Sequence, residues 1–398
     1  MNNHRVTYEG LLEPHFTQTR KTCSEPGEYL LIEDTTALSY THRRSSSIPG
    51  LGQITDQQDS QGLMMHSCLA TRIVNWTPSG TPEVELLGLL GQQCWSRAEA
   101  WPKRTHTGKT RGGESDKWGH SVFEGDVPHE ASWTRVGDRE ADIYTLMHEC
   151  QAQNLGFVLR AAHPRRVLTP SSNVMDAAQQ SRPLGCVDPP VRARPGVKAR
   201  TARVTVRACP VMLKPPYDLR DTLQPLSINL VYAAEEEPSA APPLCWILLP
   251  TKPCQTFSQA CQTLGIYATC WLIEEYHKVL KSGTHLEDSQ LGTAEGLRNL
   301  AAIHALVAVD ILKLKFLAQS RADEPVTEDL VPHLWLRLLE ARLGTQSAPW
   351  TYRTTLIAIA RLGGFLARPR DGLPGWQTIW RGWQLLQWMA LGYEIALN

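Results

Sequence analysis

The stretch YATCWLIEEYHKVLKSG, Tyr267 to Gly283, combines a helical pattern with several charged side chains. At about 100° per residue, the polar positions fall on one stripe, whose members are Tyr267, Cys270, Glu274, His277 or Lys278, and Lys281. The other side is apolar and consists of Leu272, Ile273, Tyr276, Val279 and Leu280. The stretch therefore predicts a helix that buries one face and presents a tyrosine, a carboxylate and a lysine on the other. An ordinary solvated face explains the same pattern.

The composition around this helix is typical of a globular protein, since the 398 residues are 42% hydrophobic and 20% charged. Forty basic and forty acidic side chains cancel, which excludes a uniformly basic surface but not local basic patches. Ten cysteines without a C-x-x-C pair or zinc-ligand spacing indicate free thiols in a reducing compartment. The chain has neither an apolar run of about 18 residues for a membrane span nor a signal-peptide core. We therefore expect a cytoplasmic protein with no membrane partner.

The first half of the chain alternates short apolar runs with turn residues. Strands are expected over 28–34, 63–74, 83–90, 132–138, 156–162 and 245–251, and helices over 3–22 and 141–154. This order predicts an α/β fold with a mixed sheet. We expect an N-terminal helical segment, a core in two parts, a β-rich insertion and a C-terminal helical region, over 1–27, 28–166 with 241–292, 167–240 and 293–398, respectively.

Acidic side chains stand at the ends of two expected strands and on the helix described first. Asp34 ends the first strand, Asp138 ends a later one, and Glu274 lies on the helix. Three such carboxylates in one α/β core suit a site for two divalent cations, because Mg²⁺ prefers oxygen ligands. For each aspartate alone, a turn or a helix cap is the structural alternative.

Basic residues form three local clusters that would suit a phosphate backbone. They are Arg160 to Arg166 directly after a strand, Arg192 to Arg207 on an expected hairpin, and the loop Trp101 to Arg111. When each cluster is taken alone, a solvated surface is the favoured explanation. Trp246, on a buried-strand pattern, is expected either to pack in the core or to stack on an extruded base.

Five motifs occur together in one order: IEDTTALSYTHR (32–43), GDREADIY (137–144), FVLRAAHPRR (157–166), YATCWLIEEYHKVLKSG (267–283) and IARLGGF (359–365). The chain resembles the bacterial cut-and-paste insertion-sequence transposases, which have a ribonuclease H-like core and an Asp–Asp–Glu triad. The resemblance runs from about residue 6 to near the C-terminus. It implies a ribonuclease H-like mixed-sheet core whose β insertion lies between the second aspartate and the glutamate.

The resemblance also implies roles for individual residues. The metal-binding catalytic acids would be Asp34, Asp138 and Glu274, holding two Mg²⁺ ions for which Mn²⁺ can substitute. The DNA-binding residues would be Tyr267, Lys281, Arg160, Trp246, His163 and Arg165. Partners would be transposon ends, target DNA and a second copy of the chain, with the protein on the nucleoid when it is bound to DNA. The C-terminal segment, with Trp376, Trp380 and Trp383 at helical spacing, would mediate dimerisation, although these tryptophans also suit a stripe buried within one chain.

Two departures from the family pattern affect the expected activity. The family's signature helix carries an arginine three residues after its tyrosine, where this chain has Cys270. About thirty residues precede Asp34, so the chain resembles an N-terminally short member without the module that recognises terminal repeats. The alternatives to an active transposase are therefore a catalytically impaired DNA-binding or dimerising inhibitor and a metal-dependent nuclease without end specificity.

Overall fold

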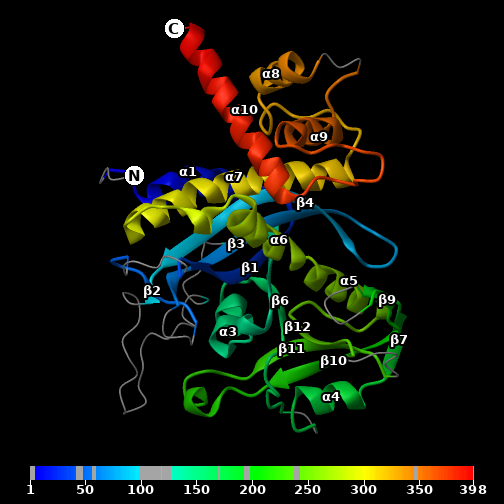
Figure 1. Cartoon of the computed structure of the whole chain (residues 1–398). Coiled ribbons are helices and arrows are strands. Elements are labelled where there is room, and N and C mark those ends of the chain that lie inside the picture. The colour runs from blue at the N-terminus through cyan, green and yellow to red at the C-terminus, as the bar shows by residue number, and fades with distance from the viewer. Residues whose placement is uncertain are drawn as a thin grey trace.

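The computed structural model describes residues 5–41, 48–55, 60–97, 118, 127–168, 171–191, 198–236, 243–344 and 348–397. Within these ranges the chain is mixed α/β, with a ten-stranded sheet and a helical C-terminal region. The mixed sheet and the C-terminal helices were predicted from the sequence and are confirmed (Figure 1). None of the helices in the described ranges is long and apolar enough to cross a membrane.

The large sheet mixes parallel and antiparallel strands. Its strands are β1 (Gly27–Ser39), β2 (Gly52–Gln53), β3 (Gln61–Trp76), β4 (Pro82–Trp95), β5 (Ala131–Gly137), β6 (Gly156–Arg160), β7 (Pro183–Val187), β10 (Val204–Leu213), β11 (Leu226–Ala234) and β12 (Cys245–Pro250). The spatial order is β2-β3-β1-β5-β6-β12-β11-β10-β7, and β4 pairs with β3. Strands β1, β5 and β6 are parallel, while the other paired neighbours are antiparallel. A separate small sheet joins β8 (Pro190–Val191) and β9 (Arg200–Thr201).

Helices cover both faces of the large sheet. They are α1 (Tyr8–Cys23), α3 (Tyr144–Ala152), α4 (Val174–Gln180), α5 (Phe257–Ala268), α6 (Trp271–Lys278), α7 (Ala294–Ser320), α8 (His333–Leu343), α9 (Tyr352–Leu362) and α10 (Trp376–Leu397). Short turns are η2 (Arg139–Ala141), η3 (Tyr217–Leu219), η5 (Leu286–Asp288) and the π-helical η4 (Val279–Gly283). Figure 1 shows α1 and α7 side by side over one part of the sheet and α8 to α10 stacked beyond them.

Strand alternation divides the core in two. Leu30 and Ile32 of β1 point to the larger cluster, which includes residues of α5, α6 and α7. Tyr29 and Leu31 point to the smaller cluster, which includes residues of α3 and α4. Side chains alternate along a strand. A residue of β1 at an even number of positions from Ile32 therefore lies on the face of the larger cluster, and the others lie on the face of the smaller cluster.

Strand β1 differs from its prediction, since it runs five residues past Asp34 to Ser39. Its antiparallel pairing with β3 reaches Ser39, but its parallel pairing with β5 ends at Glu33. The expectation that the strand ends on Asp34 is therefore wrong for the strand, although Asp34 does lie where the parallel pairing stops.

The predicted helix over 267–283 is divided into the end of α5, α6 and η4. The backbone amides of Thr269, Cys270 and Leu272 bond carbonyls three residues back rather than four. The Thr269 hydroxyl donates to the carbonyl of Ile266 at 2.6 Å, and such local bonds compete with regular helix bonding. The predicted apolar face is nevertheless buried, with Leu272, Ile273, Tyr276, Val279 and Leu280 all at most 1% exposed.

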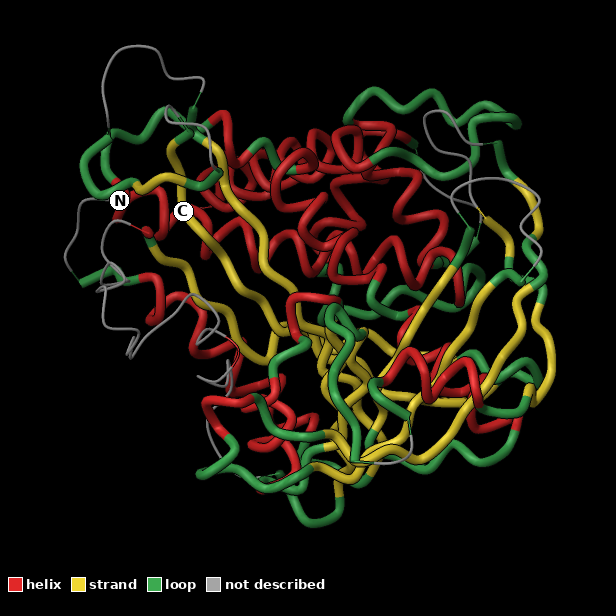
Figure 2. Tube along the Cα trace, turned by 90° about the horizontal axis from the view of Figure 1, so that it is seen from below, coloured by secondary structure: helices red, strands yellow, loops and turns green. Residues whose placement is uncertain are grey.

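The expected β-rich segment after residue 167 does contain strands, and three of them, β7, β10 and β11, extend the main sheet. Strand β12 pairs with β6, and β11, β10 and β7 follow it outward. Figure 2 shows the strands following one another across the molecule, with the helices of one layer behind them.

Helices α9 and α10 pack through two glycines. A Cβ atom at Gly382 would lie 1.8 Å from the Ile359 carbonyl oxygen, and one at Gly363 would lie 2.0 Å from the Thr378 carbonyl oxygen. Any larger residue would push the helices apart, which explains the glycine at 363 in the IARLGGF motif. Trp380 and Trp383 are buried inside this chain at 7% and 3% exposure, as one of the two sequence interpretations expected.

Candidate active site

Asp34 and Asp138 are brought together by the parallel pair β1–β5. Glu33 is opposite Gly137 in the register, so the next residues, Asp34 and Asp138, are neighbours at the point where the pairing ends. Both lie in alternation with Ile32 and Val136, which belong to the larger core cluster. The two aspartates therefore share the sheet face that α5 and α6 cover.

Glu274 joins them from helix α6, which packs on β1. Partial burial raises the pKa of the Glu274 carboxyl, and the nearby charges of Asp34 and Asp138 raise it further. The pKa of Asp138 is also raised, first by burial and then by Asp34, against an opposing hydrogen bond from the Glu140 amide. The three predicted acids thus occupy one site whose negative charges repel one another.

Cys270 stands among the three acids at the turn between α5 and α6. Burial raises the pKa of its thiol, and the charges of Asp138, Asp34 and Glu274 raise it further. The side chain is therefore a neutral thiol at physiological pH. It adds neither positive charge nor a forked donor where the family resemblance expects an arginine.

Two predicted DNA-binding residues contact each other beside the acids. Arg160, the last residue of β6, donates to the Tyr267 hydroxyl at 3.3 Å, and its guanidinium carbon lies 5.9 Å from the centre of that ring. Arg160 also opposes the rise in the pKa of Cys270, which places its charge near this thiol. Trp246 of neighbouring β12 is half-buried and packs against the larger core cluster.

Lys281 lies on the other side of the acids, in the π-helical turn η4. Its Nζ lies 3.4 Å from the Thr36 hydroxyl and 3.8 Å from a Glu287 carboxylate oxygen. Thr36 shares the face of Asp34 on β1, since it follows two residues later. The fold therefore holds Arg160 and Lys281, which are far apart in sequence, on two sides of one acidic site.

Arg165 and His163 have different surroundings. Arg165 donates through Nε and a terminal nitrogen to the carboxylate and the carbonyl of Asp142. The same carboxylate accepts the backbone amides of Ala162, at 2.7 Å, and His163, at 3.0 Å. Asp142 thereby fixes the loop after β6, and Arg165 serves that loop in this structure. The His163 residue is exposed, and its predicted contact with DNA stays a prediction.

The other basic clusters are partly engaged or lie outside the described residues. Arg200 pairs with Glu235, and Arg207 with Glu236. The loop Trp101 to Arg111 and the positions of Arg192 and Arg194 fall outside the ranges that the structure describes.

Sequence reasoning missed a buried ion pair directly beneath the site. Glu33, 1% exposed, accepts two hydrogen bonds from Arg135, at 2.8 and 2.6 Å, and lies 3.4 Å from His66 Nε2. Burial acts to raise the pKa of Glu33, but the charge and hydrogen bonds of Arg135 and His66 outweigh it and lower the pKa. The signal was present in the sequence, because a glutamate and an arginine interrupt two apolar strand patterns.

The three acids suit Mg²⁺ by donor type and by charge. Within the described ranges, no three histidine, cysteine or acidic side chains are close enough together to enclose one metal ion as they are placed. Mg²⁺ does not require such a cage, because it keeps several waters and binds through one or two carboxylates plus substrate phosphates. The mutual repulsion of Asp34, Asp138 and Glu274, seen in the raised pKa values of the last two, is what a cation would relieve.

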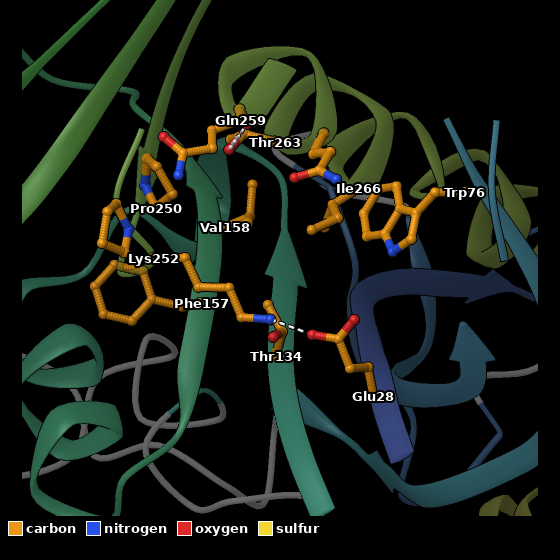
Figure 3. Close-up of a pocket in the computed structure, with 12 residues that line it drawn as sticks. Glu28, Trp76, Thr134, Phe157, Val158, Pro250, Lys252, Gln259, Thr263 and Ile266 are labelled. Atoms are coloured by element: carbon orange, nitrogen blue, oxygen red, sulfur yellow. Dashed lines mark hydrogen bonds and ion pairs between the residues drawn. The ribbon is translucent and has the colours of Figure 1, made fainter. Parts of the chain in front are cut away.

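A pocket lies at the other end of the parallel strands (Figure 3). Its volume is about 240 Å³, and its lining includes Trp76, Glu28, Lys252 and Gln259. The two charged side chains bond each other at 2.5 Å, and Gln259 accepts the backbone amides of residues 255 and 256 at the start of α5. Since these polar groups already have partners, we assign no chemistry to this pocket.

Compared with models of known protein families, the sequence matches none. The functional argument therefore depends on the geometry of the acidic site and on the sequence motifs.

Proposed function

We propose that the chain is a DNA transposase core of the Asp–Asp–Glu class, which nicks DNA and transfers the resulting 3′-hydroxyl to another strand. The observation that carries the proposal is the convergence of Asp34, Asp138 and Glu274 on one face of the sheet, with raised pKa values for the latter two. Metal-dependent phosphoryl transfer needs such an open cluster of carboxylates.

Each part of the site has a role in this reaction. Asp34, Asp138 and Glu274 would hold two Mg²⁺ ions, which supply activation of the attacking oxygen and stabilisation of the leaving oxygen. Arg160 and Lys281, on two sides of the acids, would hold phosphates of the bound strand. Water or a DNA 3′-hydroxyl is the nucleophile, so no covalent enzyme intermediate is required.

The sheet supports the finer assignment of a ribonuclease H-like core. Strands β4, β3 and β1 form an antiparallel set, and β5 and β6 continue it in parallel with β1. The first acid lies on the central strand β1 and the second directly after β5. We include the ribonuclease H-like core in the proposal on this basis.

A second copy of the chain is part of the proposal, because strand transfer at two transposon ends requires them to be held together. The outer half of α10 projects from the molecule in Figure 1. Its exposed apolar residues include Leu385 at 48%, Trp388 at 68%, Leu391 at 46% and Ile395 at 67%. These positions recur every three or four residues and form one helix face, whereas the tryptophans at 380 and 383 are buried within the chain.

A catalytically impaired DNA-binding inhibitor is the second candidate, and Cys270 is the observation that favours it. A neutral thiol at this position cannot make the bidentate contact to phosphate that the family arginine would supply. The nearby guanidinium of Arg160 offsets part of that loss.

Replacing Cys270 with arginine is expected to increase plasmid nicking. A charge-assisted bidentate contact to phosphate contributes about 1.5–3 kcal/mol, which corresponds to roughly a 10- to 150-fold gain. Cys270→Lys is the matched control, since it adds the same charge without the planar fork. Initial nicking rates at saturating Mn²⁺ would be compared, and an arginine variant no faster than wild type would show that the thiol is not a defect.

The proposed function is tested directly by incubating the wild-type chain with supercoiled plasmid in Mg²⁺, in Mn²⁺ and in EDTA. We expect nicking that requires the divalent cation and leaves a 3′-hydroxyl, detected by extension with a DNA polymerase. Nicking in EDTA would contradict the metal mechanism. DNA binding without nicking in either metal would favour the inhibitor, and nicked products without strand transfer to a second DNA would favour a nuclease.

A further inference from the structure

His277 connects the carboxylate of Asp34 to a row of buried polar side chains. Nδ1 of His277 lies 3.5 Å from Oδ2 of Asp34, and its Nε2 lies 3.4 Å from the hydroxyl of Ser67. The Gln92 amide nitrogen donates to that hydroxyl at 2.9 Å, and the Tyr8 hydroxyl donates to the Gln92 amide oxygen at 2.7 Å. We call these five residues the Tyr8–Asp34 network. It runs from α1 through β4, β3 and α6 to the catalytic edge of β1.

The hydrogen-bonding capacity of each group gives the network a single direction. A carboxylate only accepts, so the proton of His277 is on Nδ1, facing Asp34. Nε2 of the neutral ring then accepts, and the Ser67 hydroxyl must donate to it. The Ser67 oxygen is left to accept from the Gln92 amide nitrogen, which turns the amide oxygen of Gln92 toward the Tyr8 hydroxyl.

The burial of the central residues of the network favours the same set of hydrogen bonds. His277 is 6% exposed, while Ser67 and Gln92 are 0% and 5% exposed, so the three have little access to water. Asp34 itself has a side chain 25% exposed and open to the site. The network therefore contacts one oxygen of a carboxylate that is partly exposed.

We propose that His277 is a positioning residue, and that the Tyr8–Asp34 network sets the orientation of the Asp34 carboxylate toward a divalent cation. The inference rests on the proposed function, in which Asp34 is a cation ligand. Groups that hydrogen-bond a metal ligand fix its orientation, and their loss typically lowers metal affinity about 10- to 100-fold. In this chain the orienting group comes from the same helix as Glu274, three residues later, so α6 supplies one acid and positions another.

The test compares three substitutions at one position by equilibrium binding of Mn²⁺, measured from the electron paramagnetic resonance signal of the free ion. His277→Asn keeps a nitrogen donor near the place of Nδ1 and is expected to retain most of the affinity. His277→Gln places its amide farther along, near Nε2, and His277→Leu has no donor. Both are expected to weaken Mn²⁺ binding by about 10- to 100-fold.

A control and a second variant keep the outcome interpretable. His304→Asn removes a partly buried histidine whose Nδ1 bonds the Thr284 hydroxyl at 2.8 Å, outside the network, and should leave Mn²⁺ affinity unchanged. Tyr8→Phe removes one hydroxyl at the far end and should weaken binding in the same direction, by less than His277→Leu. If His277→Leu does not fold, Tyr8→Phe still tests whether the network affects Mn²⁺ binding.

Mn²⁺ binding and DNA nicking together distinguish a failure of the positioning role from a failure of the proposed function. Wild type that binds Mn²⁺ but does not nick DNA would fail the proposed function, while the order Asn above Gln and Leu would still support positioning. Equal Mn²⁺ affinities for wild type, His277→Leu and Tyr8→Phe would overturn positioning even in an active nuclease. Wild type that binds no Mn²⁺ would overturn both.

Discussion

Glu274→Gln is expected to abolish metal-dependent nicking, with a loss on the order of a thousandfold or more, because bound metal contributes several kcal/mol to such reactions. The substitution keeps the size of the side chain but removes the charge that lies with Asp34 and Asp138. Burial raises the pKa of Glu274, and the nearby charges of Asp34 and Asp138 raise it further. Nicking of supercoiled plasmid in Mn²⁺ would measure the effect.

The adjacent residue provides the matched control. Glu275 is on the same helix turn, but its carboxylate accepts the Trp376 indole N–H at 2.9 Å and contacts Lys278 at 3.3 Å. Glu275→Gln keeps an amide oxygen for the indole and should nick at close to the wild-type rate. Equal losses in the two variants would indicate damage to α6 and not removal of a catalytic acid.

Arg135→Met is expected to destabilise the fold by about 3–5 kcal/mol, the usual cost of leaving one member of a buried ion pair without its partner. Glu33 and the Arg135 side chain are 1% and 5% exposed, so water cannot replace the lost guanidinium. The free energy of unfolding from urea titrations would give the value. A change below about 1 kcal/mol, the scale of exposed pairs, would contradict it.

The pH dependence of that loss has a definite sign. The folded pKa of Glu33 lies below its ordinary value of 4.5, so the pair contributes stability above that value and loses it as the pH falls through the folded pKa. The penalty of Arg135→Met should therefore be largest near pH 7 and smaller below pH 4.5. A double variant, Glu33→Leu with Arg135→Met, should recover much of the stability, because an apolar pair of similar volume often replaces a buried ion pair at little cost.

Much of the sheet could be predicted because its strands follow local rules. The hairpin of β3 and β4 has apolar runs separated by turn residues, and both strands appear where they were expected. Asp34 and Asp138 could be named because each follows a buried strand pattern. Their proximity required the parallel register of β1 and β5, which no local pattern contains.

Other features depend on contacts between distant segments. Nothing near Arg165 in the sequence shows that its guanidinium bonds Asp142, twenty-three residues earlier. The break after α5 depends on a threonine hydroxyl that bonds a nearby carbonyl, which a helical periodicity does not reveal. One hydrogen bond of the Tyr8–Asp34 network joins two residues that are 210 positions apart in the chain. No local sequence pattern could have predicted this network.

The indole of Trp376, the first residue of α10, ties the C-terminal helix to the helix of Glu274. It bonds Glu275 on α6, and Nζ of Lys315 from α7 lies 3.8 Å from the centre of its ring. The helix that carries the exposed apolar face thus begins against the helix that carries Glu274. This contact gives the C-terminal helix a direct hydrogen bond to the residue that follows Glu274.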